Sequence, residues 1–244
     1  MRALSLIVLL VIVIPAGAVA KPAGMNVSIA ELFPLAFKEN SNRQSGILVD
    51  ITNELSTETK LPLKSRIKPY KRTLKEASQG LTDLVYTTKN NNYPELIPIS
   101  KVYDLRLTLL NKKSTVSYIH IENPKIGILR GSQVARANIK FKAAEIFEFN
   151  DYSQGIEMLL RDRFQYIIGS DLILHYHLSQ TPKLKDLITF PGSIISSNEI
   201  WLFISGKSQH KDNIDVLREG LNTLKNKGVI MKICNSYAGS GWNK

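Results

Sequence analysis

Hydrophobic residues follow two different periods along the first part of the chain. In MNVSIAELF (25–33), Val27 and Ile29 alternate with polar neighbours, which is the pattern of a half-buried strand. From Gly46 onward, hydrophobic residues recur at helical spacing and predict an amphipathic helix. In chain order the pattern predicts a strand at 25–33, a helix at 46–59, a strand at 61–70, a helix at 70–79 that ends at Gly80, and a strand at 84–88. This β-α-β-α-β order is typical of a parallel sheet covered by helices.

A second α/β series follows a further strand at 105–113. It consists of a strand at 125–129, a turn at Gly131, a helix near 132–137, a short strand at 144–147, a helix at 152–162 and a strand at 166–170. A last strand at 199–205 and a helix at 211–227, which Gly228 ends, complete the pattern. The sequence therefore predicts an α/β fold.

Two segments of equal length share the same layout. TLKEASQGLTDLVYTT (73–88) and GIEMLLRDRFQYIIGS (155–170) each predict a helix followed by a strand, and the strands end in hydroxyl residues, Thr88 and Ser170. This similarity suggests two α/β lobes. Ligands of open parallel sheets bind beyond the carboxyl ends of the strands. Two such edges that face each other would form a cleft, with Thr87 and Thr88 on its floor.

Residues 1–20 predict a cleavable secretory signal. The single charge of Arg2 precedes an apolar run, and small residues ending at Ala20 form an A-x-A site. An anchored N-terminal helix is the alternative, which is disfavoured because the apolar run is shorter than the ~20 residues of a membrane span. Since residue 21 is Lys rather than a Cys that could carry a lipid, we expect a protein of the Gram-negative periplasm.

The distribution of charge bears on the possible partners of the protein, and the cysteine content bears on how the fold is stabilised. The formal net charge is +11, but the Lys and Arg residues are scattered without a long basic run. This distribution, together with secretion, favours a solvated basic surface over a nucleic-acid interface. The single Cys234 excludes an internal disulfide, and its position at the end of an apolar helical pattern predicts a buried side chain.

Motifs for catalysis and cofactors are scarce. The sequence has no G-x-S-x-G, no G-x-x-x-x-G-K-[ST] and no H-E-x-x-H motif. His175 and His177 could hold a metal, but the sequence offers them no evident third ligand. We therefore expect a protein without cofactor or metal that is not an enzyme.

Five segments occur in an order and at a spacing that identify a family. They are GILVDITNELSTETKLPL, PYKRTLKEASQGLTDLVYTT, IGILRGSQVA, RDRFQYIIGSDLIL and LNTLKNKGVIMKI. Together they resemble the bacterial periplasmic solute-binding proteins of family 3, the polar amino-acid receptors of ABC importers. The resemblance covers about residues 25–237 and implies a type II periplasmic-binding-protein fold with two lobes. It places the hinge crossings near 110–113 and 191–198, the first lobe at 21–111 and 197–244, and the second lobe at 112–196.

The resemblance also implies a set of ligand-binding residues. Position by position, these residues are Glu31, Phe33, Tyr70, Arg72, Thr87, Thr88, Tyr93, Tyr103, Ser132, Gln133, Ser170 and Asp171. By this resemblance Phe33 and Tyr70 would stack on the ligand. Arg72 and the turn at Ser132 would hold an anionic end, and Asp171 a cationic or hydroxyl end.

Two positions depart from the family pattern. Tyr93 stands where the family has an Arg that clamps the α-carboxylate of an amino acid, and the Asp on the ligand side is displaced by one residue, to Asp171. A phenol cannot form the two-pronged bond of a guanidinium. We therefore expect a small polar solute, either amino-acid-like or a small organic anion. The expected partner is an inner-membrane ABC permease, and the expected state is a monomer.

Other interpretations of the same residues stay open. Tyr70 could be a core or lid aromatic, Arg72 a solvated side chain, and Ser132 an N-cap, while the two threonines could be turn formers. Some members of this fold are dehydratases, so Glu31 and Asp171 could form an acid-base pair if they meet across the cleft. A sensory module that signals without transport is a further possibility.

Overall fold

The computed structural model describes residues 24–40, 43–89, 92–115, 123–132, 135–136, 139, 143–239 and 242. The predicted signal sequence and the predicted site residue Gln133 lie outside the described residues. Within the described ranges, no helix is both long enough and apolar enough to cross a membrane.

Strands and helices alternate along most of the described chain. The strands are β1 (Met25–Ala30), β2 (Phe37–Lys38), β3 (Gln44–Ser45), β4 (Leu63–Lys68), β5 (Leu84–Thr88), β6 (Leu96–Asn111), β7 (Lys125–Leu129), β8 (Glu145–Phe149), β9 (Tyr166–Ser170) and β10 (Ser193–Ser205). The helices are α1 (Ile47–Thr59), α2 (Tyr70–Gln79), α4 (Tyr152–Leu160), α5 (Asp171–Gln180), α6 (Pro182–Leu187), α7 (Ile214–Asn226) and α8 (Val229–Ala238), with a 3₁₀ turn η2 (Lys211–Asn213) before α7.

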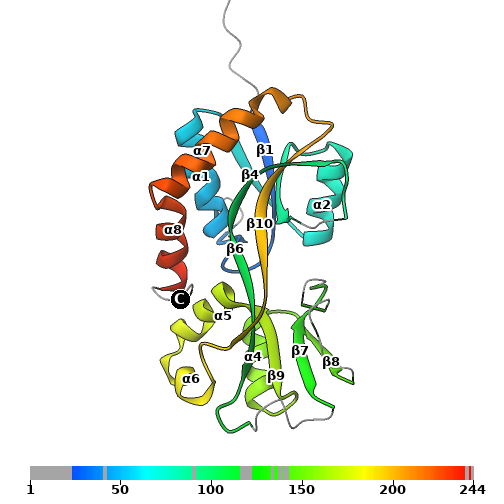
Figure 1. Ribbon diagram of the computed structural model, residues 1–244, viewed down its shortest axis with the longest axis vertical. Coiled ribbons are helices and arrows are strands. Elements are labelled where there is room, and N and C mark those ends of the chain that lie inside the picture. Colours follow the sequence, from blue (N-terminus) through cyan, green and yellow to red (C-terminus); the bar gives the residue numbers. More distant parts are fainter. Residues whose placement is uncertain are drawn as a thin grey trace, which may run out of the picture.

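Two long antiparallel strands, β6 and β10, connect two α/β lobes (Figure 1). The eight-stranded sheet has the order β4-β1-β5-β10-β6-β9-β7-β8. β1 runs parallel to β4 and β5 in the first lobe, and β7 runs parallel to β8 and β9 in the second. The predicted fold class, an α/β protein with two lobes and two crossings between them, is confirmed, whereas the residue boundaries of the lobes stay a prediction.

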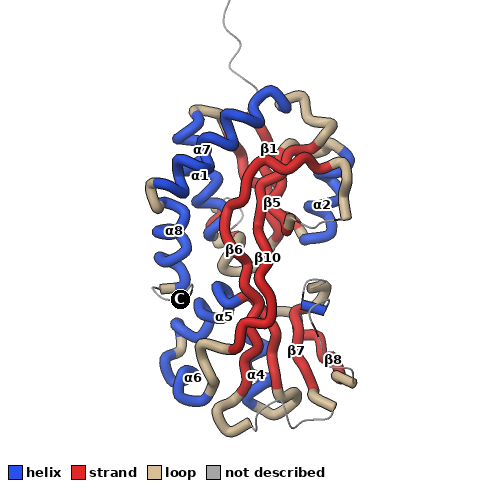
Figure 2. Tube along the Cα trace, in the orientation of Figure 1, coloured by secondary structure: helices blue, strands red, loops and turns tan. Residues whose placement is uncertain are grey.

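The main core of the first lobe lies between its sheet and helices α1, α7 and α8 (Figure 2). Ile51 of α1 and Leu221 of α7 are fully buried there, and so is Cys234 of α8, as the sequence predicts. The two helices α1 and α7 approach closely because Gly220 has no side chain. A Cβ at Gly220 would lie 2.4 Å from the Cγ2 of Thr59.

Strand β9 is buried on both faces of the sheet in the second lobe. Ile167 belongs to the cluster under α4 and α5, whereas Tyr166 and Ile168 belong to a cluster on the other face. Such burial explains the nearly continuous apolar sequence YIIGS, which is typical of strands that are covered on both faces. The strand ends at Ser170, where α5 begins at Asp171.

Candidate functional site

The carboxyl ends of the parallel strands in the first lobe lie at one edge of the sheet. Ala30 of β1 pairs with Lys68 of β4, and the backbone N–H of Glu31 donates to the carbonyl of Lys68 at 2.9 Å. Tyr70 begins helix α2 just beyond β4, and Thr88 ends β5. The structure therefore gathers the predicted residues Glu31, Tyr70 and Thr88 at a single edge.

The second lobe presents an equivalent edge. Ile128 of β7 is in register with Ile168 of the parallel strand β9, so both strands end on the same side. Ser132 follows β7, and its backbone N–H donates to the carbonyl of Leu129 at 3.0 Å. Ser170 ends β9. Ser132 and Ser170 thus share the strand-end edge of the second lobe.

The two edges face each other along the middle of β6. Thr88 is in register with Ile200 of β10, which in turn is in register with Tyr103 of β6. Ser170 is in register with Leu107 of β6. Because Tyr103 and Leu107 are four residues apart, the two rows lie about 13 Å apart along the strand. The strand ends of both lobes therefore point toward the same stretch of β6 and β10 from opposite sides.

Buried hydroxyl groups without partners occur on both sides of this stretch. Among the residues that the structure describes, the Oγ1 of Thr87 and the Oγ of Ser170 have no hydrogen-bond partner, although the two residues are only 3% and 4% exposed. The same holds for the Tyr103 hydroxyl, with the residue 5% exposed. Buried polar groups in proteins are normally paired, so each of these hydroxyls needs a physical explanation. A bound polar molecule would supply partners for hydroxyls at the strand ends.

Ser132 has the geometry of an N-cap. Its Oγ accepts a hydrogen bond from the backbone N–H of Ala135 at 3.3 Å, and its carbonyl accepts from the N–H of Arg136 at 3.1 Å. This agrees with the N-cap interpretation left open by the sequence. It does not conflict with ligand binding, because backbone donors near a helix start can also receive an anionic group.

Phe33 packs between the lobes in this structure. Its ring centroid lies 4.6 Å from that of Phe37 and 4.9 Å from that of Tyr176, which belongs to α5 of the second lobe. Phe33 is 38% exposed. The neighbouring residues Leu32 and Leu35 also pack against the apolar cluster of the second lobe. The structure therefore shows an interlobe contact at Phe33, and stacking on a ligand stays a prediction.

The predicted cation Arg72 is engaged within its own helix. Its Nε lies 2.7 Å from Oε1 of Glu76, and Lys68 pairs with the same carboxylate. Hydrogen bonds from Lys68 and then from Arg72 lower the pKa of Glu76. The Arg72 side chain is 69% exposed, so an anion could reach it only in competition with Glu76 and water. Tyr93 is half-buried and packs against the apolar cluster under α2.

The carboxylate of Asp171 is held by Arg106 instead of facing an empty space. Its Oδ2 lies 2.6 Å from Nε of Arg106, and its Oδ1 accepts from the backbone N–H of Leu172 at 2.7 Å. Arg106 also donates to the backbone carbonyl of Trp242. Sequence reasoning missed Arg106, although a single cation inside the apolar strand LRLTLL is a signal that could have identified it.

The Asp171 carboxyl is a source of pH-dependent stability. Burial raises its pKa, and the hydrogen bond from Arg106 opposes this rise only in part. A raised pKa in the folded state favours the protonated carboxyl, so its contribution to stability is lost as the pH rises through that pKa. We therefore expect wild-type stability to fall relative to that of Asp171→Asn as the pH rises from about 4 to 7. Urea unfolding of both proteins across this range checks the sign; a constant difference would contradict it.

The groups considered for metal binding and for acid-base catalysis have other partners within the described residues. Nδ1 of His175 lies 2.6 Å from the Ala238 carbonyl, and Nδ1 of His177 lies 3.3 Å from the Ser153 hydroxyl. In the ranges that the structure covers, no group of three His, Cys, Asp or Glu residues could hold a metal ion. The carboxylate of Asp171, one half of the possible acid-base pair, is bound to Arg106.

Comparisons with known proteins found similarity in the fold but none in the sequence. No family model matches the chain, and no curated protein matches its sequence. Among solved structures, the GluR0 ligand-binding core in complex with L-glutamate superimposes with a TM-score of 0.73 at 15% identity, covering 89% of this chain and 99% of that one. This chain has the type II periplasmic-binding-protein fold. The resemblance drawn from the five sequence segments is thus confirmed at the level of the fold.

Two further type II structures have titles that name different functions. The substrate-binding protein of an amino acid ABC transporter has a TM-score of 0.68 at 18% identity, covering 88% of this chain and 99% of that one. An ancestral amino acid-binding protein, described as a precursor of cyclohexadienyl dehydratase, has a TM-score of 0.69 at 14% identity, covering 88% and 94%. At these identities the similarity establishes the fold alone.

Proposed function

We propose that this chain is a divergent family 3 solute-binding protein that captures a small polar solute between its two lobes. The observation that carries the proposal is that two strand-end edges face each other across the middle of β6. At these edges the buried hydroxyls of Thr87 and Ser170 have no partner within the described part of the chain. Proteins of the same fold that bind amino acids support it. The protein acts by binding and not by catalysis.

Binding is coupled to movement of the lobes. The lobes are joined by β6 and β10, so bending of these strands would bring the two edges together. A solute that touches Thr88 on one side and Ser132 on the other favours the closed state, because it has more contacts there than in the open state. The lobe boundaries predicted above, 21–111 with 197–244 and 112–196, belong to this proposal.

The solute is amino-acid-like or a small organic anion, and hydroxyl and backbone groups hold it. The two candidate side chains for charged recognition are already engaged, Arg72 by Glu76 and Asp171 by Arg106. Tyr93, at the position of the family's Arg, is uncharged and packs against an apolar cluster. Hydroxyl groups at the strand ends remain as recognition elements. These contacts favour a solute that is recognised by several hydrogen bonds over one whose carboxylate is bound by an Arg guanidinium.

The proposed setting is the periplasm, with delivery to an inner-membrane ABC permease. Residues 1–20 have the composition of a cleavable signal, and similarity to an ABC transporter component favours import. The protein works as a monomer and needs no cofactor. Cell fractionation tests the compartment, and loss of solute uptake on deletion of the gene tests delivery.

Replacement of one hydroxyl on each edge tests the proposed site. A thermal-shift screen of amino acids and small organic acids first identifies the solute that stabilises the protein. Thr88→Val combined with Ser132→Ala should then raise Kd by about 10- to 100-fold, because two hydrogen bonds of roughly 1 kcal/mol each are lost. Titration calorimetry measures the change.

The matched control carries the same chemical changes away from the strand ends. Thr57→Val with Ser236→Ala removes two exposed hydroxyls that, among the described residues, bond to carbonyls of their own helices. This variant should bind as tightly as the wild type. Equal affinity of the strand-end variant and the control would refute the proposed site.

A dehydratase or lyase is the second candidate function. It is favoured by the similarity to an ancestral binding protein described as a precursor of cyclohexadienyl dehydratase. On this alternative the protein would convert a prephenate-like acid, and Glu31→Gln or Asp171→Asn would abolish turnover. We expect no turnover from the wild type; product formation that depends on these carboxyls would replace the binding proposal.

A further inference from the structure

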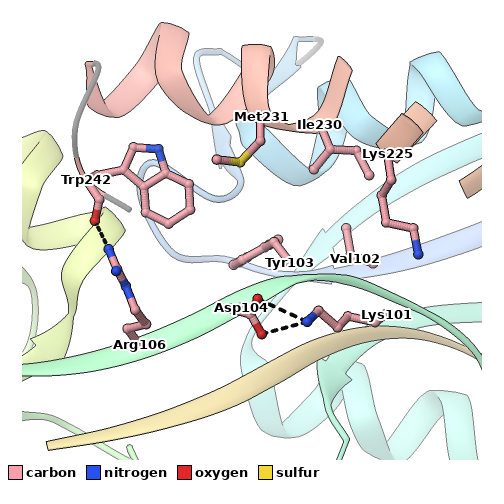
Figure 3. Close-up of a pocket in the computed structure, with 9 residues that line it drawn as sticks. All are labelled: Lys101, Val102, Tyr103, Asp104, Arg106, Lys225, Ile230, Met231 and Trp242. Atoms are coloured by element: carbon pink, nitrogen blue, oxygen red, sulfur yellow. Dashed lines mark hydrogen bonds and ion pairs between the residues drawn. The ribbon is translucent and has the colours of Figure 1, made fainter. Parts of the chain in front are cut away.

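A cavity of about 330 Å³ lies beside the middle of β6, between that strand and helices α7 and α8 (Figure 3). Tyr103 of β6 forms one wall and Met231 of α8 the opposite wall, while Trp242 and Lys225 lie at the two ends. Of the predicted ligand-binding residues, Tyr103 is the one that lines this space. The volume lies in the range of small-molecule sites.

The cavity contains a cation whose charge is not balanced. Nζ of Lys225 lies 3.1 Å from the neutral Ser100 hydroxyl, and none of the described carboxylates is within ion-pair distance of it. Lys101, by contrast, is paired with Asp104 at 2.8 Å. Burial, and then the positive charge of Lys101, lower the pKa of Lys225. An anion beside Lys225 would remove this electrostatic cost.

The cavity has a largely apolar surface, to which Tyr103 contributes, and the Tyr103 hydroxyl itself is buried. Tyr103 is 5% exposed, and its hydroxyl has no partner among the described residues. Burial raises the pKa of this phenol, so it stays protonated. Met231, Ile230 and the Trp242 indole supply apolar contact area. The lining therefore suits a molecule with one anionic group and an apolar body.

We propose that this cavity is a second binding site, distinct from the strand-end site, for a small organic anion with an apolar body. Lys225 pairs with the carboxylate, and Met231, Trp242 and Tyr103 contact the apolar body. The site lies beside the segment of β6 that joins the lobes. Arg106, which also lines it, bonds both to Trp242 and to Asp171 of the second lobe. An occupant therefore contacts residues that connect the two lobes, and can bias their closure.

Benzoate is a suitable probe because it combines one carboxylate with a rigid apolar ring, and benzamide has nearly the same shape without the charge. Titration calorimetry on the full chain should detect benzoate at concentrations up to about 10 mM, whereas benzamide should bind at least tenfold more weakly. Lys225→Met should reduce benzoate affinity at least tenfold, and Lys225→Arg should retain it. Melting of Lys225→Met without ligand should be unchanged or raised, because an unpaired, partly buried charge is removed.

Two controls distinguish this site from surface charge and from the strand-end site. Lys227→Met, which removes an exposed lysine paired with Glu58, should leave benzoate binding unchanged. Thr88→Val with Ser132→Ala should also leave it unchanged, so failure of one site does not decide the other. Absence of benzoate binding, equal binding of benzamide, or full benzoate affinity in Lys225→Met would each overturn the second site.

Discussion

Replacing Arg106 by methionine should lower the free energy of unfolding by about 3 kcal/mol at pH 7. The Arg106 and Asp171 side chains are only 18% and 9% exposed, and their atoms lie 2.6 Å apart. Removal of the guanidinium leaves a buried carboxylate without its cation and leaves the Trp242 carbonyl without its donor. Both losses destabilise the folded state more than an exposed ion pair would. Urea unfolding followed by circular dichroism measures the change.

A second substitution separates the loss of the ion pair from a general packing defect. Arg106→Met combined with Asp171→Asn removes the buried charge while keeping an oxygen that can accept from Leu172. The double variant should be more stable than Arg106→Met alone. Arg43→Met, whose side chain is 72% exposed, should change stability by less than about 0.5 kcal/mol. Near-wild-type stability of Arg106→Met, or no recovery in the double variant, would show that the pair does not support the fold.

Replacing Trp242 by alanine should cost a similar amount, about 3 kcal/mol. The residue is 5% exposed and packs against the main core of the first lobe. Its indole Nε1 donates to Oδ1 of Asn235 at 2.9 Å, and its carbonyl accepts from Arg106. The substitution therefore creates a cavity beside α8, where Trp242 bonds to Asn235. Urea unfolding again gives the free-energy change.

Trp242→Phe is the intermediate case. It keeps an aromatic ring in the core but loses the hydrogen bond to Asn235, so we expect a cost of about 1 kcal/mol. Leu187→Ala removes a residue that is 52% exposed and should be nearly neutral. If Trp242→Ala is no less stable than Leu187→Ala, Trp242 does not contribute to the fold as described.

The short buried strands were predicted well because their periods and end signals are strong. The predicted strands at 84–88, 125–129 and 166–170 coincide with β5, β7 and β9, and the helix at 70–79 with α2. Each strand is a compact apolar run, and Gly80 supplies the left-handed residue, with φ 82°, that ends α2. Local patterning determines such elements.

The two strands that join the lobes were predicted only in part. The segment expected at 105–113 is the second half of β6, which begins at Leu96, and the segment at 199–205 is the second half of β10, which begins at Ser193. The parts that were not predicted, LIPISKVYD (96–104) and SIISSN (193–198), contain proline or consecutive polar residues and lack strict alternation. Such long strands depend on pairing with each other, which no local pattern reveals.

The candidate site was predicted at the level of strand ends but not of side-chain partners. Thr88 and Ser170 are expected from the ends of two apolar strands. Arg106 and Asp171, however, are 65 residues apart in sequence, and Arg106 and Trp242 are 136 apart. Contacts at such separations follow from the folded topology. The family resemblance therefore implied a ligand role for Asp171 without revealing that Arg106 binds its carboxylate.

The most direct test of the account is the distance between the lobes with and without solute. Spin labels are attached at Lys71→Cys in α2 and at Asn150→Cys after β8, which are exposed positions on opposite lobes. The native Cys234 is buried and should not react with the label. Labels at Glu54→Cys and Lys71→Cys, both in the first lobe, provide the control. Pulsed electron–electron double resonance should show a shorter distance between the lobes when the stabilising solute is added. The control distance should not change. An interlobe distance that is the same with and without that bound solute would contradict capture by closure.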